Sequence, residues 1–174
     1  MEVPIEQMQP GDIVAFKGQG LTFTILSFIL SLVEPSWRER KDWKPWHLSI
    51  AMYKTPDFWI MFEAVGGEGN QLVTYGPGDF GDAKSYRFLP SVPAEIIRDE
   101  FVNIYKGWPY DNSAYFGVIF SWIWHKLTGK WWRVIDKAHM CWETAACWAA
   151  FTRHPFQPEW EYPFLPRIMG KLEE

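Results

Sequence analysis

The order of secondary-structure patterns most constrains the fold of this chain, because strand patterns come first and helical patterns follow. Segments rich in alternating apolar residues and bounded by Pro, Gly and Asp are typical of strands, and they occur at 11–16, 47–53, 58–65, 71–75 and 85–89. Helical patterns occur at 94–105, 114–127 and 141–151, with one more at 21–33, between the first two strands. We therefore expect an α+β fold, in which an antiparallel sheet of about five strands packs against helices.

The composition is that of one folded, aromatic-rich domain. The 174 residues suffice for one domain with a sizeable core, and no repeat or linker divides them, so we expect a single domain over 1–174. Hydrophobic residues make up 48% and aromatic residues 18%, which excludes a disordered chain. The net charge is −4 and the Lys and Arg residues are scattered, so no nucleic-acid partner is indicated.

Neither the start of the sequence nor its longest apolar run indicates export or a membrane span. The start, MEVPIEQMQPGD, lacks the basic and apolar regions of a signal peptide. The apolar run LTFTILSFILSLV, at 21–33, has 13 residues, whereas a spanning helix needs about 20. We expect no signal peptide, no transmembrane helix, a buried or interfacial helix at 21–33, and a cytoplasmic or phage-encoded protein.

Both cysteines of the chain lie in one helical segment, HMCWETAACWAAF, at 139–151. Six residues along a helix correspond to a rise of about 9 Å and a rotation of about 600°, which leaves Cys141 and Cys147 about 120° apart. The Cα atoms of bridged cysteines usually lie within about 7 Å. We therefore expect no disulfide, and different roles for the two thiols.

Cys141 is the better candidate for a nucleophile. It falls at the expected helix N-terminus, with Glu143 in the first turn, Arg153 and His154 at the far end, and Pro155 as the stop. Unpaired backbone N–H groups at that end favour a thiolate and can hold a developing oxyanion. Cys147 lies two turns further on, and we expect it to fill the core.

Of the four histidines, His47 is the best candidate for the base that such a nucleophile needs. Alternation along the strand separates His47, Ser49, Ala51 and Tyr53 from a core-facing set of Trp46, Leu48, Ile50 and Met52. His47 is therefore expected among small and polar side chains, where a base is accessible. Surface, packing or poorly placed positions are expected for the other three, His125, His139 and His154.

Glu63 is the candidate to orient the imidazole, because it is the only charged residue inside the apolar strand FWIMFEAV. A three- or five-residue loop that pairs Tyr53 with Trp59 would place Ser49 opposite Glu63, and His47 diagonal to it at about 7–8 Å. A four-residue loop would instead bury Glu63 on the apolar side. The proposed chemistry thus predicts the loop register.

The order of five short motifs resembles a known family. GDIVAF, WHLSIAMY, a strand with FEA, GWPYDNSAY and MCWETAACW follow one another as in the circularly permuted papain-like branch of the NlpC/P60 superfamily. That branch includes amidases of the YaeF/YiiX type and, more distantly, proteins similar to lecithin:retinol acyltransferase. In permuted members the His strand precedes the Cys helix, as it does here. The resemblance covers about residues 10–151.

The resemblance implies roles for matching positions only. Cys141 matches the nucleophile, His47 the base and Glu63 the orienting residue, while Tyr110 lies where the family often has a cleft tyrosine. Trp142 departs from the pattern, since a small residue commonly follows the cysteine. The candidate substrate-binding residues are Tyr110, Trp142 and Trp46.

The expected function is that of a thiol hydrolase that cleaves an amide bond, in a peptide or cell-wall-type substrate, without a cofactor. A lipid-directed acyltransferase or thioesterase is the alternative within enzymes, because the apolar 21–33 segment and the Trp-rich stretches suit an acyl chain. A non-catalytic binding or virion-associated module is the alternative outside them. The sequence leaves open whether the protein binds a membrane surface, and it does not indicate an oligomeric state.

A metal site would have to use His139, Cys141 and Cys147. Their spacing matches no common zinc pattern, and the two thiols face different ways along the helix. We therefore expect no metal.

Overall fold

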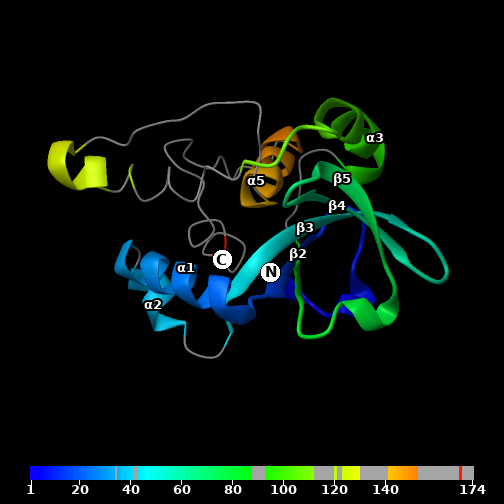
Figure 1. Ribbon diagram of the computed structural model, residues 1–174. Coiled ribbons are helices and arrows are strands. Elements are labelled where there is room, and N and C mark those ends of the chain that lie inside the picture. Colours follow the sequence, from blue (N-terminus) through cyan, green and yellow to red (C-terminus); the bar gives the residue numbers. More distant parts are fainter. Residues whose placement is uncertain are drawn as a thin grey trace.

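The computed structural model of the chain describes residues 1–33, 35–40, 43–87, 93–111, 120, 123–129, 141–152 and 169. It is an α+β structure built on one antiparallel six-stranded sheet, in the order β1-β6-β2-β3-β4-β5 (Figure 1). The strands are β1 (Glu2–Val3), β2 (Ile13–Lys17), β3 (Pro45–Lys54), β4 (Trp59–Val65), β5 (Gly69–Tyr75) and β6 (Lys84–Tyr86). Five match the expected segments, and β1 is additional because a two-residue strand leaves no pattern in the sequence.

Helices lie beside the sheet and at one end of the molecule. They are α1 (Gly20–Val33), α2 (Pro35–Glu39), α3 (Ala94–Tyr105) and α5 (Cys141–Phe151), with 3-10 turns at Ile5–Gln7 and Pro77–Asp79. The predicted helices at 21–33, 94–105 and 141–151 are confirmed within a residue. Within the expected 114–127 helix, residues 120 and 123–127 are helical, and the others lie outside the described residues.

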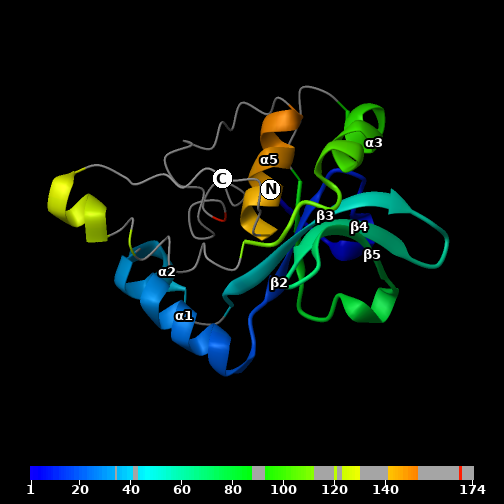
Figure 2. The same ribbon diagram turned by 45° about the horizontal axis from the view of Figure 1, so that its top comes forward.

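One face of the sheet is covered by α3 and α5, which lie on the same side in both views (Figures 1 and 2). Leu48, Ile50 and Met52 of β3 point into this layer, as the alternation predicts, and pack with Phe62, Phe101 and Trp148. The Phe101 and Trp148 rings meet edge to face, with centroids 5.0 Å apart. The larger of the two hydrophobic cores therefore joins the sheet to these helices.

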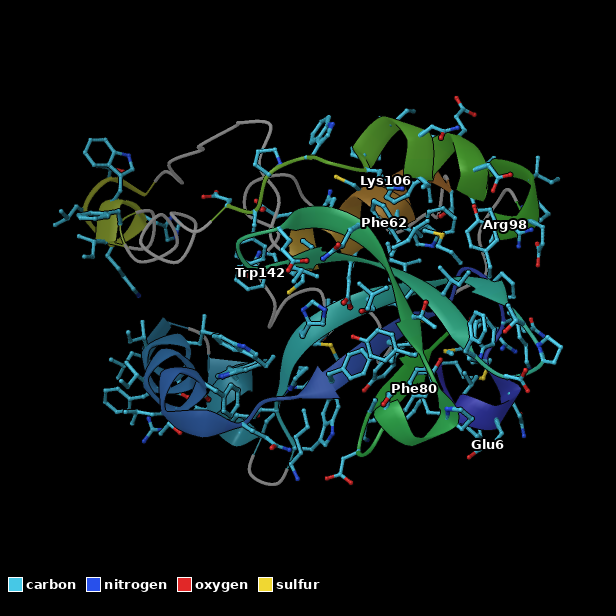
Figure 3. All side chains as sticks on the ribbon, turned by 45° about the vertical axis from the view of Figure 1, so that its right-hand side comes forward. Glu6, Phe62, Phe80, Arg98, Lys106 and Trp142 are labelled. Carbon is cyan, nitrogen blue, oxygen red and sulfur yellow. The ribbon has the colours of Figure 1, made fainter. Side chains whose placement is uncertain are left out.

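The opposite face is closed by a smaller hydrophobic cluster. It contains Ala51, Met61, Val14 and Trp59 from the sheet, and it is covered by Met8 near the N-terminus and by Phe80 after β5. Figure 3 shows Phe62 between the sheet and the helices and Phe80 on the other side of the sheet. The face that carries His47 is thus mostly apolar and covered over much of its area, whereas the sequence suggested an open face of small and polar side chains.

A β-bulge corrects the register between β3 and β4. Four residues, 55–58, connect the strands, and Tyr53 pairs with Ile60 rather than with Trp59, so the predicted loop register is wrong. The pairing shifts between Ala51 and Tyr53, and beyond it Ile50 pairs with Phe62. Because one extra residue in a strand reverses the faces, Glu63 still lies on the His47 side. Tyr53 moves to the other face, where it packs with the larger core.

The helix α1 lies between β2 and β3 in the chain and packs against α2. In one buried contact the Trp37 indole N–H donates to the Ser27 hydroxyl across 3.1 Å, and Leu30 packs against the larger core. Four of its large apolar side chains are exposed, so of the two predicted alternatives for this segment, a buried or an interfacial helix, the buried one does not hold. Among the described residues, no helix is long and apolar enough to cross a bilayer.

Candidate active site

Adjacent strands place His47 beside Glu63. His47 is the third residue of β3 and Glu63 the fifth of β4, and the bulge turns both toward the same face. The His47 Nε2 atom lies 2.7 Å from Glu63 Oε2. The Glu63 side chain is 5% exposed and that of His47 is 25% exposed. A buried carboxylate and a partly exposed imidazole are therefore in direct contact, as the sequence predicts.

Two further hydroxyl groups hold the Glu63 carboxylate. Tyr75 O–H donates to both oxygens, at 3.2 and 3.1 Å, and Ser49 O–H donates to Oε2. Burial raises the pKa of Glu63, but the hydrogen bonds from His47, Ser49 and Tyr75 and the His47 charge together lower it. Burial and the nearby carboxylate raise the pKa of Tyr75, which stays a donor. Glu63 is thus held as a carboxylate facing His47.

Aromatic rings enclose the exposed side of this pair. Phe16 pairs with His47 across the β2–β3 ladder, and their ring centroids lie 5.9 Å apart. The Phe16 ring also lies 5.3 Å from that of Tyr75 and 6.3 Å from that of Phe80. Such low-polarity walls strengthen the charge interaction between His47 and Glu63.

The helix α5 begins at Cys141 and places its thiol over the start of β3. Cys141 Sγ lies 3.9 Å from the Trp46 carbonyl oxygen, and the residue is 2% exposed. Glu143 lies in the first turn, which agrees with the predicted helix polarity. The expected far end, at Arg153 and His154, lies outside the described residues.

The thiol of Cys141 also interacts with the His47 ring. Burial lowers the pKa of His47, but the charge and hydrogen bond of Cys141, together with those of Glu63, outweigh it and raise the pKa to about 10. At neutral pH the ring therefore carries a proton. A protonated imidazole beside a thiol, at the N-terminus of a helix, stabilises a thiolate.

Cys147 is separate from this site. It is partly buried against the larger core, and neither cysteine forms a disulfide, as predicted. Burial, with a smaller effect of the Glu143 charge, raises the pKa of the Cys147 thiol to about 12. It is therefore a packing residue that stays protonated at neutral pH.

Two hydrogen bonds, one buried and one partly buried, fix α5 on the sheet. Thr144 O–H donates to Asn70 Oδ1 at 3.1 Å, and the Trp148 indole N–H donates to the Gly11 carbonyl at 3.0 Å. These bonds join α5 to the start of β5 and to the turn before β2. They set where Cys141 meets β3.

The three candidate substrate-binding residues lie in different surroundings. Trp142 is 5% exposed and belongs to the larger core, where the first turn of α5 meets the sheet (Figure 3). Tyr110 is partly buried and packs against the same core. Trp46 is partly exposed, and its ring meets that of Phe23 in α1 edge to face, with centroids 5.4 Å apart. Of the three, Trp46 contacts the thiol itself, through its carbonyl oxygen.

Of the remaining histidines, His125 lies in the helical segment 123–128, whereas His139 and His154 lie outside the described residues. No group of three or more His, Cys, Asp or Glu side chains in the described part of the chain could hold a metal ion. A shallow cavity lined by Ile5, Lys54 and Phe58 lies at the opposite end of β3 from His47.

Sequence reasoning did not assign roles to Ser49 and Tyr75. Ser49 was placed on the correct face, but nothing in the sequence indicated that it donates to Glu63. Tyr75 shares a face with Glu63 because β4 and β5 pair without a register shift, with Glu63 opposite Gln71 and Trp59 opposite Tyr75. A prediction of the pairing register of β4 and β5 would have placed Tyr75 on the same face as Glu63.

Comparison with models of protein families, with curated proteins and with solved structures finds no match. The geometry of Cys141, His47 and Glu63 is therefore the basis for a functional proposal.

Proposed function

We propose that this chain is a cysteine amidase with a circularly permuted papain-like fold of the NlpC/P60 type. The observation that carries the proposal is the position of His47, which contacts the Glu63 carboxylate at 2.7 Å and the Cys141 thiol with the same ring. The chain order supports it, because the His strand β3 precedes the Cys helix α5. Acyl transfer through a thiol requires a nucleophile in contact with a base, and a group that contacts the base and orients it.

The reaction would proceed in two steps. The Cys141 thiolate attacks the amide carbonyl carbon, and backbone N–H groups in the first turn of α5 stabilise the oxyanion. His47 gives its proton to the departing amine nitrogen as the C–N bond breaks, which leaves a thioester. His47 then takes a proton from water, whose oxygen attacks the thioester and releases the acid and the Cys141 thiolate.

The roles of the two His47 nitrogens follow from their partners. Because Nε2 contacts Glu63, Nδ1 is the nitrogen left to exchange a proton with substrate and thiol. Glu63 keeps the ring oriented and stabilises its protonated form, with Ser49 and Tyr75 holding the carboxylate. Ser49 and Tyr75 are thus positioning residues rather than catalytic ones.

The test is the pH dependence of alkylation at each cysteine, read by mass spectrometry. Cys141 should react with iodoacetamide well below pH 8, while Cys147, with its raised pKa, stays unmodified and serves as the internal reference. In His47→Ala and His47→Asn, Cys141 should lose its reactivity at low pH. The matched control, His125→Ala, changes a histidine outside the site and should react like the parent.

Formation of an acyl-enzyme gives a second readout. Treatment with p-nitrophenyl acetate should acetylate Cys141, and the acetyl group should persist longer in the His47 variants that still acylate, because water lacks its base. If Cys141 alkylates like an ordinary thiol in the parent and in both His47 variants, the pair is not functional. The chain would then be a binding module.

An acyl-lipid substrate is a second candidate for the same thiol. Trp46, whose carbonyl contacts Cys141, packs against Phe23 of α1, and α1 exposes a row of large apolar side chains. That arrangement favours an acyltransferase or thioesterase that takes an acyl chain. Product analysis with a peptide amide and with a phospholipid separates the two, because only one of them would acylate Cys141.

A further inference from the structure

The helix α1 presents a row of large apolar side chains to solvent. Leu21, Ile25, Phe28 and Leu32 are 77%, 52%, 65% and 62% exposed. Their spacing of four, three and four residues puts them on one face of the helix. We call these four side chains the α1 stripe.

The buried face of α1 is fixed by polar contacts. The Trp37 indole donates to Ser27, the Ser31 hydroxyl donates to the Ser27 carbonyl at 2.7 Å, and the Lys44 ammonium donates to Ser31 at 3.4 Å. Small polar residues therefore face inward beside Leu30, which packs against the larger core, while four large apolar residues face outward. Rotating the stripe inward would break the bonds of Trp37 and Lys44, so the exposed face is a stable feature of the fold.

A second apolar row lies at the same end of the molecule. Phe120, Ile123, Trp124 and Leu127 are 58%, 41%, 48% and 77% exposed, and their spacing also fits one helical face. Residues 123–128 and α1 lie on the same side, away from α3 and β5 (Figures 1 and 2). The two rows hold eight of the twelve exposed large apolar side chains of the described residues. We call the second row the 120–127 stripe.

The segments around both stripes are basic, although the chain is acidic. The described residues of segments 20–44 and 120–129 contain four Lys and Arg and one Glu, a net charge of +3 in a chain of net charge −4. The helix α1 itself has no charged residue, and Arg38, Arg40 and Lys126 follow or interrupt the apolar rows. Apolar helical faces flanked by cations and containing Trp are the pattern of helices that lie in the interface of an anionic bilayer.

We propose that the α1 stripe and the 120–127 stripe form a docking surface for an anionic lipid bilayer. Both rows insert their apolar side chains at the level of the headgroups, and the flanking cations face the lipid phosphates and carboxylates. Through Phe23 and Trp46, the docked helix α1 is in contact with the strand that carries His47. The surface brings the site to a membrane, but binding itself does not require Cys141.

The experiment is vesicle co-sedimentation of the full chain. Vesicles of phosphatidylcholine alone are compared with vesicles that contain roughly one-third phosphatidylserine. The parent should bind the anionic vesicles at least tenfold more strongly, and added salt should weaken that binding because it screens the cations.

Two pairs of substitutions test the stripes independently. Ile25→Ser with Phe28→Ser changes the α1 stripe, and Trp124→Ser with Leu127→Ser changes the other; each should weaken binding at least tenfold. The matched control is Ile96→Ser, because Ile96 is 72% exposed but lies on α3, and it should bind within twofold of the parent. Thermal melting checks each variant, and if one pair fails to fold, the other decides.

Three results would overturn the proposal. The parent binds neither vesicle, or both stripe pairs bind like the parent, or the parent is a dimer in sedimentation velocity that the stripe pairs convert to monomers while vesicles remain unbound. The last result would assign the stripes to a second copy of the chain. Cys141→Ala should bind vesicles like the parent, so failure of the proposed hydrolase and failure of docking are distinguishable.

Discussion

Replacing Glu63 by Gln removes the negative charge from the buried side of His47 while keeping the shape of the side chain. Glu63 is 4% exposed and accepts hydrogen bonds from His47, Ser49 and Tyr75. A hydrogen bond to a charged group contributes about 1.5–3 kcal/mol and a neutral one about 0.5–1.5 kcal/mol. The protonated His47 ring should therefore lose about 1–2 kcal/mol of stabilisation, which lowers its pKa by about one unit.

The same change alters the pH dependence of stability. The pKa of His47 is raised to about 10, above its usual value. The stability that the protonated ring contributes to the fold is therefore fully present below about pH 6.5 and is lost as the pH rises through about 10. Glu63→Gln should lower the free energy of unfolding by about 1–2 kcal/mol at neutral pH. The difference from the parent should shrink above about pH 10, where the ring is neutral in both proteins.

Two assays measure these effects. NMR titration of the His47 ring gives the shift in its pKa directly, and urea unfolding at neutral and at alkaline pH gives the change in stability. Glu68→Gln is the matched control, because Glu68 is an exposed carboxylate bound to Gln71 and not to the site. An unchanged His47 titration in Glu63→Gln, or an equal shift in the Glu68 variant, would refute the role of Glu63.

The remaining predictions concern the hydrogen bonds from Tyr75 to the Glu63 carboxylate and the close contact of Gly69 in β5 with Trp108. Tyr75→Phe should raise the pKa of Glu63 and cost about 1–2 kcal/mol in urea unfolding at neutral pH. That loss should vanish at acid pH, because a carboxylate with a lowered pKa contributes only while ionised. Gly69→Ala should destabilise the protein far more than Gly67→Ala. Both glycines have positive φ, 85° and 84°, so the backbone strain of an alanine is similar at the two positions. Only at Gly69 would a Cβ come within 2.3 Å of the Trp108 carbonyl oxygen. Thermal melting of the two glycine variants tests this, and equal losses would contradict it.

The sequence predicted most elements because their patterns are local. The limits of α3 and α5 agree with the prediction, since Pro93 precedes α3 and the apolar residues of both helices recur with helical spacing. The prediction that Cys141, His47 and Glu63 come together rested on less local information, namely the order of the motifs along the chain. The number of strands was underestimated by one, because β1 has two residues and is defined by its partner β6.

The closure of the His47 face could not be predicted from alternation alone. Alternation assigns faces within one strand, but it does not say what covers them. Met8, which precedes β2, and Phe80, which follows β5, cover this face. The Phe80 ring stacks on that of Phe16 in β2. Such contacts between distant parts of the chain depend on loop paths, which leave no period in the sequence.

The bulge in β3 links the register of the candidate site to α3, which lies on the other face of the sheet. The Met52 carbonyl, at the bulge, accepts a hydrogen bond from the Arg98 guanidinium at 3.2 Å. Next to it, Tyr53 lies with its ring 4.5 Å from the same guanidinium, and its hydroxyl donates to Asp99. These contacts favour placing residues 52 and 53 on one face, which is what a bulge does.

Without that extra residue, the four-residue loop would turn Glu63 toward the apolar core and away from His47. The register that brings the imidazole to the carboxylate is therefore supported by Arg98 and Asp99 of α3, through their contacts with Met52 and Tyr53. The pair thus rests on tertiary contacts as well as on the β3–β4 hairpin.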